Sequence, residues 1–256
     1  MRLGTLTPSF RLGSATPSRI YLGTNQVFLN PLSLSPALWL SDTGSDLSVW
    51  PDLSGNGRNA TQATPANRPE IVSAALNGRQ VRRFDGVNDS LAGTLSNVSS
   101  LSVFAVFVPT LDATSTALYA RVFSQRGSAT LADFAQTGHY IPIIRDSQLS
   151  AFGSWASSGV RATQSAVDVT KEIRSSIHTG SLISNFRNGS ASSTYSHTLG
   201  NNGAAYFVGG QSPSTTEITS GFLKGDIAEI LVFPTALSTA DRQAVETYLN
   251  AKWAIY

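Results

Sequence analysis

Short apolar stretches recur along this chain between turn-forming residues, from about residue 38 to residue 233. Stretches of this kind, rich in Val, Ile, Phe and Tyr and bounded by Gly, Asn, Asp, Ser or Pro, are typical of β-strands. We predict strands at residues 38–40, 80–84, 101–108, 118–123, 140–144, 149–152, 172–177, 182–186, 204–208 and 226–233. Hairpin-type turns are expected at residues 55–57, 85–86, 188–189 and 201–203, where Asn or Asp stands beside Gly.

Two of the predicted strands, residues 103–108 and, apart from Glu229, residues 227–233, are apolar on both faces. Because side chains alternate between the faces of a strand, both faces of these strands need a cover. A C-terminal helix can supply one, since Ser238 is a good N-cap with Asp241 three residues further on. Its expected buried stripe comprises Val245, Tyr248, Leu249, Lys252 and Trp253. The prediction is an all-β sandwich with a short C-terminal helix.

Composition narrows the class of protein. Of the 256 residues, 41% are hydrophobic and only 13% are charged, which argues against a coiled coil, a helical bundle or a disordered acidic chain. No apolar run approaches the ~20 residues of a membrane span. The sequence has no cysteine, which excludes disulfides and cysteine metal sites. The densest basic cluster, Arg79, Arg82 and Arg83, is expected to be a solvated strand face, so no nucleic-acid partner is predicted.

The first 33 residues differ from the rest of the chain. Leu-Gly-Thr or Leu-Gly-Ser recurs from residues 3, 12 and 22, Thr-Pro-Ser recurs from residues 7 and 16, and no acidic residue precedes Asp42. Strand-like pieces at residues 19–22 and 26–29 cannot bury a core alone. We predict a docking arm over residues 1–33 and a main domain over residues 34–256; the alternative is a first hairpin of the main domain. The segment lacks the apolar stretch of a secretory signal, so we expect another route of export, such as release of an assembled particle by lysis.

Sequence motifs follow one another in a characteristic order through the main domain. They are Ala37-Leu-Trp-Leu-Ser-Asp, Val49-Trp-Pro-Asp-Leu-Ser-Gly-Asn-Gly-Arg, Leu76-Asn-Gly-Arg, Arg83-Phe-Asp-Gly-Val-Asn-Asp, Arg187-Asn-Gly, Val208-Gly-Gly and Gly225-Asp-Ile-Ala-Glu-Ile with the helix that ends at Trp253. Together they resemble the concanavalin A-like, laminin G-like jelly roll of bacterial and phage proteins. The resemblance covers about residues 34–256 and implies the fold, whereas this fold hosts many activities.

The arm carries a second, shorter resemblance. Arg11-Leu-Gly-Ser and Ile20-Tyr-Leu-Gly-Thr-Asn-Gln-Val are similar to segments at the N-termini of tailed-phage structural proteins. The resemblance implies that the arm anchors a displayed domain to a virion. Arg11, Arg19, Ile20 and Tyr21 would then contact the partner surface.

Signatures of catalysis are weak. Asp226 and Glu229 stand three residues apart on one predicted strand, so they are expected to point to opposite faces, which is poor geometry for the carboxyl pair of a glycosidase. Glu229 is instead expected to make a structural bond near the terminal helix. There is no Gly-x-Ser-x-Gly elbow and no phosphate loop. His139, His178 and His197 show no spacing that selects a base.

One turn is a candidate calcium site. Asp85, Asn88 and Asp89 could supply three oxygen side chains to Ca²⁺. The alternative is an Asx turn, in which the side chain bonds to its own backbone. Asp52 with Asn56 presents the same two alternatives, and no other cofactor is predicted.

Sugar binding needs exposed aromatic side chains flanked by polar groups. Trp155 lies in a Ser/Gly-rich stretch and is the best candidate, with His139 and Tyr140 as a second pair; the alternative is that Trp155 caps the edge of the core. Three other tryptophans are expected in the core: Trp39, Trp50 and Trp253.

The leading hypothesis is a non-enzymatic virion structural protein at the head or tail surface, acting as capsid decoration, fibre or tail adhesin. It would bind other virion proteins through its arm, form a homo-oligomer (a trimer by analogy) and bind host surface glycan. The alternative is a free bacterial lectin-like carbohydrate-binding module. A polysaccharide hydrolase is the third hypothesis.

Overall fold

The computed structural model describes residues 19–22, 25–96, 98–110, 120–125, 139–145, 149–152, 162–163, 170–196, 205–210 and 221–256. Its elements are β1 (Arg19–Leu22), β2 (Asn25–Leu29), η1 (Pro31–Leu34), β3 (Leu38–Leu40), β4 (Val49–Trp50), β5 (Ala60–Thr61), η2 (Pro65–Asn67), β6 (Glu70–Leu76), β7 (Arg79–Asp85), β8 (Leu91–Thr94), β9 (Leu101–Pro109), β10 (Ala120–Gln125), β11 (His139–Arg145), β12 (Leu149–Phe152), β13 (Ala162–Thr163), β14 (Glu172–His178), β15 (Leu182–Arg187), β16 (Ser190–Ser196), β17 (Ala205–Val208), β18 (Lys224–Phe233) and α1 (Thr239–Trp253). The η elements are 3-10 helices.

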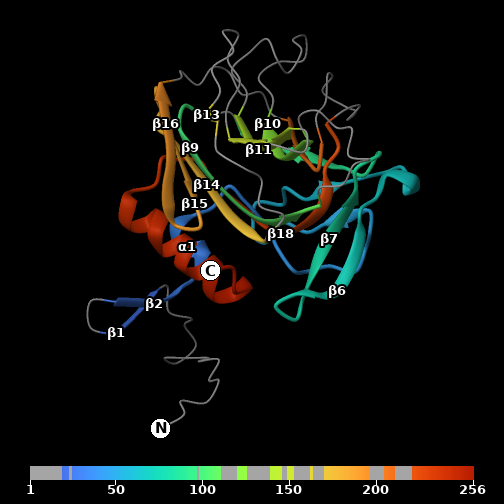
Figure 1. Cartoon of the computed structure of the whole chain (residues 1–256). Helices are drawn as coiled ribbons and strands as arrows, with labels where there is room; N and C mark the ends of the chain where they lie inside the picture. The colour runs from blue at the N-terminus through green and yellow to red at the C-terminus, as the bar shows by residue number, and fades with distance from the viewer. Residues whose placement is uncertain are drawn as a thin grey trace.

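Two antiparallel sheets make up the sandwich (Figure 1). The helix-side sheet has the strand order β16-β15-β14-β9-β18-β7-β6, with β3 added beside β18. The opposite sheet has the order β13-β12-β11-β10-β17-β8-β5-β4. The predicted fold class, an all-β sandwich with a C-terminal helix, is confirmed.

Strands β9 and β18 lie side by side in the middle of the helix-side sheet and divide the apolar residues into two cores. Val103, Ala105 and Phe107 of β9 join the inter-sheet core, whereas Phe104 and Val106 join a second, helix-side core. Both faces of these strands are therefore covered, as their two-sided apolar pattern predicts.

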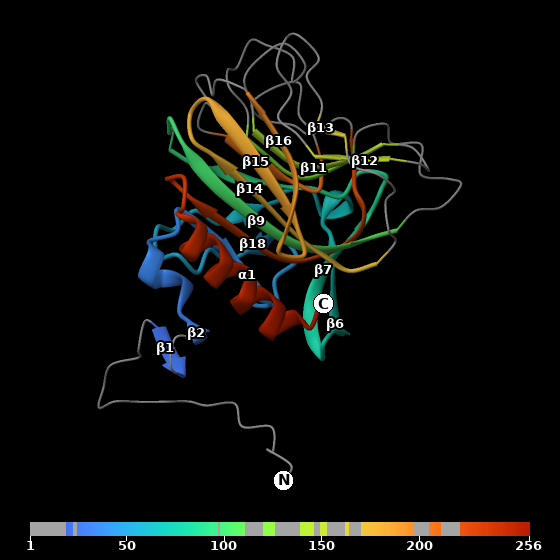
Figure 2. The ribbon, with the colours of Figure 1, turned by 60° about the vertical axis from the view of Figure 1, so that its left-hand side comes forward.

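Helix α1 lies across the outer face of the helix-side sheet (Figure 2). Its cap is the expected one, because the Ser238 Oγ accepts a hydrogen bond of 3.1 Å from the Asp241 amide. Val245, Leu249 and Trp253 are at most 1% exposed and form the centre of the helix-side core. Within the described residues, no helix has the length and apolar character that a membrane span requires.

The chain before the main domain forms a hairpin, in which β1 and β2 pair in antiparallel register. Leu29, at the end of β2, is 2% exposed and packs in the helix-side core, and β2 lies beside α1 in both ribbon views (Figures 1 and 2). The end of β2 is thus packed against the helix-side core through Leu29. Arg19, Ile20 and Tyr21 lie in β1, and Arg11 lies outside the described residues. The docking function of the arm stays a prediction.

Two expectations from the sequence are wrong in their geometry. The turn at Asp85 and Gly86 leads from β7 in one sheet to β8 in the other, so it makes a corner of the sandwich and not a hairpin. Arg82 is 2% exposed and donates to the carbonyl oxygens of Asp46 and Val49, so it faces inward and does not share a solvated face with Arg79 and Arg83.

Six of the described strands were not predicted from the sequence: β4, β5, β6, β8, β13 and β16. Strands β4, β5 and β13 have only two residues each, and the apolar residues of β6 do not alternate with polar ones. Strands β8 and β16 are rich in Ala, Ser, Gly and Thr and therefore carry little of the apolar signal of a strand. The expected hairpin at Asn188 and Gly189 does join β15 to β16. The expected turn at residues 201–203 lies outside the described residues.

Candidate functional site

A groove of about 610 Å³ opens at one rim of the sandwich, and we call it the rim groove. Five separate parts of the chain form it: the 3-10 helix η1 with the turn that follows, the β4–β5 connection, the segment after β8, the end of β10 and the end of β18. Its lining residues are Leu32, Ser35, Pro36, Ala37, Ser54, Asn56, Arg58, Leu95, Ser96, Val98, Gln125, Val232 and Pro234.

Asp52 holds the β4–β5 connection in shape. Its Oδ1 accepts the amides of Trp39 and Ser54 at 3.0 and 2.9 Å. Its Oδ2 accepts the Ser54 hydroxyl and the Arg58 amide at 2.7 and 2.9 Å. The carboxylate thus has two donors on each oxygen, and the turn alternative for Asp52 is confirmed.

Asn56 and Arg58 project from this fixed loop to the opposite wall of the groove. The Asn56 amide nitrogen donates to the carbonyl of Pro36 at 3.1 Å. The Arg58 guanidinium donates to the carbonyl of Ala37 at 2.9 Å and to the Ser96 hydroxyl at 3.1 Å. The groove therefore exists before any ligand arrives, which lowers the entropy cost of binding.

A buried tyrosine supports the loop from below. The Tyr206 hydroxyl donates to the Arg58 carbonyl oxygen at 2.7 Å, and its ring stacks on Phe123 with centroids 5.8 Å apart. Burial raises the pKa of Tyr206 far above its usual range, so this hydroxyl stays protonated as a donor.

The rim groove borders one of the strands singled out from the sequence. Gln125, which lines the groove, lies directly opposite His139 in the β10–β11 ladder, and Ser124 lies opposite Tyr140. The backbones of the two predicted sugar-binding residues thus run beside the groove. Their side chains and the whole of Trp155 lie outside the described residues, so the predicted roles of these three residues stay predictions.

A second cleft of about 400 Å³ contains two of the predicted calcium ligands, and we call it the charged cleft. The Asp85 Oδ1 accepts the amides of Val87, Asn88 and Asp89 at 2.8, 3.1 and 3.3 Å. The Asp89 Oδ2 accepts the Asp85 amide at 2.9 Å. These are the bonds of an Asx turn.

Three acidic residues (Glu70, Asp85 and Asp89) and three basic residues (Arg68, Arg83 and Lys224) line the charged cleft. Burial, together with the charges of Asp85 and Glu70, raises the pKa of Asp89 to about 6. The described residues contain no cluster of three or more His, Asp or Glu side chains arranged to hold a metal. Calcium binding by Asp85, Asn88 and Asp89 stays a prediction.

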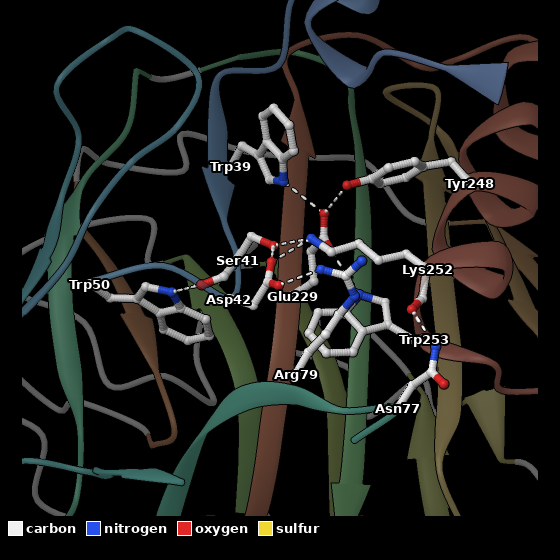
Figure 3. A network of polar contacts seen from close by, with 10 residues as sticks. All are labelled: Trp39, Ser41, Asp42, Trp50, Asn77, Arg79, Glu229, Tyr248, Lys252 and Trp253. Carbon is white, nitrogen blue, oxygen red and sulfur yellow. Dashed lines mark hydrogen bonds and ion pairs between the residues drawn. The ribbon is translucent and has the colours of Figure 1, made fainter. Parts of the chain in front are cut away.

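Glu229 is the centre of a buried polar network beneath α1 (Figure 3). It is 0% exposed, and its Oε1 accepts the Trp39 indole at 2.7 Å and the Tyr248 hydroxyl at 3.0 Å. Its Oε2 accepts the Trp253 indole at 2.7 Å and pairs with the Lys252 Nζ at 2.9 Å. The structural role expected for Glu229 is confirmed, and its carboxylate ties β3, β18 and α1 together.

A neighbouring carboxylate extends this network to β7. Asp42 pairs with Lys252 at 2.7 Å and with Arg79 at 2.9 Å. Burial favours the neutral acid, but the bonds and charges of Lys252 and Arg79 outweigh it and lower the pKa of Asp42 to about 2.

The expectation that Asp226 and Glu229 point to opposite faces is wrong, because a β-bulge lies between Ile227 and Glu229. The bulge places Asp226 and Glu229 both on the outer face of the sheet, with Ile227 and Ile230 turned into the inter-sheet core. Asp226 pairs with Arg83 at 2.7 Å. Each carboxylate therefore has its own cationic partner.

The inner face of β14 and β15 carries a charge cluster that the sequence did not reveal. Glu172, 2% exposed, pairs with Arg174 and Arg187, each at 2.5 Å. Ile173 and Ile177 occupy the helix-side core, so the alternating polar residues of β14 face between the sheets. From alternation alone, the polar residues of β14 would be expected to face solvent. Nothing in the local sequence indicates that they face the other sheet instead.

Neither a comparison with protein-family models nor one with curated proteins finds a match. Solved structures do match, at low sequence identity. The binding domain of Paraclostridial Mosquitocidal Protein 1 is 14% identical with a TM-score of 0.59, over 86% of this chain and 53% of that one. The receptor-binding domain of botulinum neurotoxin D is 10% identical with a TM-score of 0.56, over 84% and 53%.

Domain 4 of AbnA, an extracellular arabinanase of Geobacillus stearothermophilus, was solved in complex with arabinotriose. It is 14% identical with a TM-score of 0.54, over 83% of this chain and 98% of that one. The chain thus spans about half the length of the toxin binding domains and nearly all of the arabinanase domain. The matched structures share the β-sandwich fold with this chain.

Proposed function

We propose that this chain is a non-catalytic carbohydrate-binding β-sandwich module. The observation that carries the proposal is the likeness to the arabinanase domain, which this chain covers almost completely and which was solved with arabinotriose bound. The likeness to the binding domains of two toxins supports a role in binding rather than in turnover.

The rim groove supports the proposal by its size and its rigidity. Its volume of about 610 Å³ lies within the roughly 300–1,000 Å³ range of small-ligand sites. Asp52 and Tyr206 fix the loop that carries Asn56 and Arg58. A preformed polar groove is the form that a binding module requires.

The carboxylates at the helix-side sheet support binding over hydrolysis. A retaining glycosidase needs two carboxyl groups about 5–5.5 Å apart that are available to the substrate. Glu229 holds four donors and is fully buried, and Asp226 is paired with Arg83. Glu172 is likewise paired, with Arg174 and Arg187.

The test is an array of immobilised neutral and acidic oligosaccharides probed with the full-length chain. We expect saturable binding to at least one oligosaccharide, with no release of reducing ends from the same compound in solution. Failure to bind any oligosaccharide on the array contradicts the proposal. Release of reducing ends would support the hydrolase hypothesis in its place.

The display of this module on a virion is a separate part of the proposal. It rests on the repeats within residues 1–24 and on the phage-like segments at Arg11 and Ile20. Antibody-gold electron microscopy of particles from cells that make this chain tests it. Label on heads or tails supports display, whereas particles without label leave the free lectin-like module.

A further inference from the structure

Resting on the proposed function, we propose that the rim groove is the carbohydrate-binding site and that it takes a neutral oligosaccharide. Asn56 and Arg58 hydrogen-bond adjacent hydroxyl groups of the sugar, and Leu32 packs against a sugar ring. None of the residues predicted from the sequence to bind sugar is among these three.

Asn56 and Arg58 lie next to each other at the groove. The Asn56 Nδ2 and the Arg58 Nη1 both donate to the carbonyl oxygen of Ala37, at 3.4 and 2.9 Å. The Asn56 Nδ2 also donates to the Pro36 carbonyl and to the Ser54 hydroxyl. Acceptors therefore surround this nitrogen, which fixes the orientation of the amide.

This orientation leaves complementary hydrogen-bonding groups for a ligand. Asn56 is exposed, and within the described part of the chain its Oδ1 accepts no hydrogen bond. A guanidinium has five N–H donors, of which the bonds to Ala37 and Ser96 use two. The Asn56 Oδ1 can therefore accept a hydrogen bond from one sugar hydroxyl, and the Arg58 guanidinium can donate one to the neighbouring hydroxyl, because each hydroxyl can both donate and accept.

Most of the polar groups that line the groove are uncharged, which suits a neutral ligand. Arg58 is the one ionisable residue among those that line the groove, and the other polar lining side chains are hydroxyls and amides of Ser35, Ser54, Asn56, Ser96 and Gln125. The Arg58 guanidinium already donates to the Ala37 carbonyl oxygen and to the Ser96 hydroxyl, and its remaining N–H groups can donate to neutral sugar hydroxyls.

The apolar wall supplies the second half of a sugar site. Leu32 is 43% exposed, a large apolar side chain left in solvent at the mouth of the groove, and Pro36 and Pro234 line the same groove. A sugar has C–H groups on the faces of its ring and hydroxyls around its edge. Leu32 and Pro36 would contact the C–H groups of the ring face, while Asn56 and Arg58 contact the hydroxyls.

The test uses the full-length chain and four neutral trisaccharides, namely arabinotriose, xylotriose, cellotriose and maltotriose, with 3′-sialyllactose and trigalacturonic acid as acidic comparisons. Binding is followed by NMR at the side-chain amide of Asn56 and the Nε–H of Arg58. We expect both signals to shift with a neutral trisaccharide, and the affinity to be insensitive to salt.

Two matched variants provide an independent measurement. Leu32→Asp should weaken binding of that trisaccharide about tenfold or more, because it places a charge where a sugar ring packs. Leu47→Asp is the control, since Leu47 is equally exposed, at 42%, and lies outside the groove, and it should change affinity less than about twofold.

The outcomes separate this inference from the proposed function. Trisaccharide binding that shifts neither groove signal and is unchanged by Leu32→Asp overturns the groove and leaves the binding module in place. Binding of the acidic saccharides alone overturns the neutral class. Failure of every saccharide, here and on the array, overturns the proposed function together with the site.

Discussion

At the scale of single residues, Glu229 decides how the helix is attached to the sandwich. Four donors, one from β3 and three from α1, converge on one carboxylate that is 0% exposed. Burial and the nearby Glu229 charge raise the pKa of Tyr248 far above its usual range, so the tyrosine remains a donor in this network.

We predict that Glu229→Gln lowers the free energy of unfolding by about 2–3 kcal/mol, because Lys252 loses one of its two counter-charges, with Asp42 remaining, and an amide N–H replaces a buried acceptor. Asp226→Asn is the matched control on the same strand. Its partner Arg83 is half exposed, so the loss there should be about 1 kcal/mol or less. Urea unfolding measures both, and equal losses would contradict the role given to Glu229.

The raised pKa of Asp89 predicts that the free energy of unfolding depends on pH in the direction opposite to that of most carboxyl groups. Its pKa is about 6 in the folded protein and near 3.8 in the unfolded chain. The folded state therefore holds more protons between about pH 4 and 6, and the free energy of unfolding falls as pH rises through this window. Asp89→Asn should remove this part of the fall.

Urea unfolding of both proteins at several pH values between 4 and 7 tests this difference. Asp42 does not interfere, since its pKa of about 2 places its effect at more acid pH: stability from Asp42 is complete above about pH 4 and is lost as pH falls toward 2. Parallel curves for the wild type and Asp89→Asn would show that Asp89 is not the group responsible.

At the scale of elements, the structure differs from the local sequence pattern at two places, the first hairpin and the bulge in β18. From the sequence, the segment before residue 34 is predicted to be a docking arm, with a first hairpin of the main domain as the alternative. Its strands are too short for the sequence to show what they pack against. The structure places Leu29, at the end of β2, in the helix-side core with residues of α1.

We predict that Leu29→Ala lowers the free energy of unfolding by about 2–5 kcal/mol, the usual cost of emptying a packed leucine site. Leu47→Ala, at a position that is 42% exposed, should cost about 0.5 kcal/mol or less. If thermal or urea unfolding does not distinguish Leu29→Ala from the wild type, the hairpin is not packed on α1 in solution.

The spacing of apolar residues predicts a helix or strand well where a single helical or strand period dominates the segment. The capped helix with Val245 and Trp253, and the two-sided strand β9, follow directly from spacing. A single extra residue in β18 reverses the alternation that placed Asp226 and Glu229 on opposite faces. No sequence period can reveal such a bulge, because it is set by the partner strands.

At the scale of the whole molecule, the sequence predicts the sandwich but not its groove. Strands and turns are local features, whereas the rim groove joins Leu32, Asn56, Ser96, Gln125 and Pro234 from five distant parts of the chain. Aromatic side chains in polar stretches were the available signal for sugar binding, and a wall of leucine and proline beside amides gives no such signal. Among the described residues, His139 connects the predicted sugar-binding residues to the groove, because its backbone lies opposite Gln125.

The measurement that tests the account most directly is calorimetric titration of the full-length chain with the oligosaccharide that it binds best on the array. We predict a saturable heat with one site per chain, and an unchanged oligosaccharide recovered at the end. A titration without heat or saturation for every oligosaccharide that the array offers would contradict a carbohydrate-binding role for this sandwich.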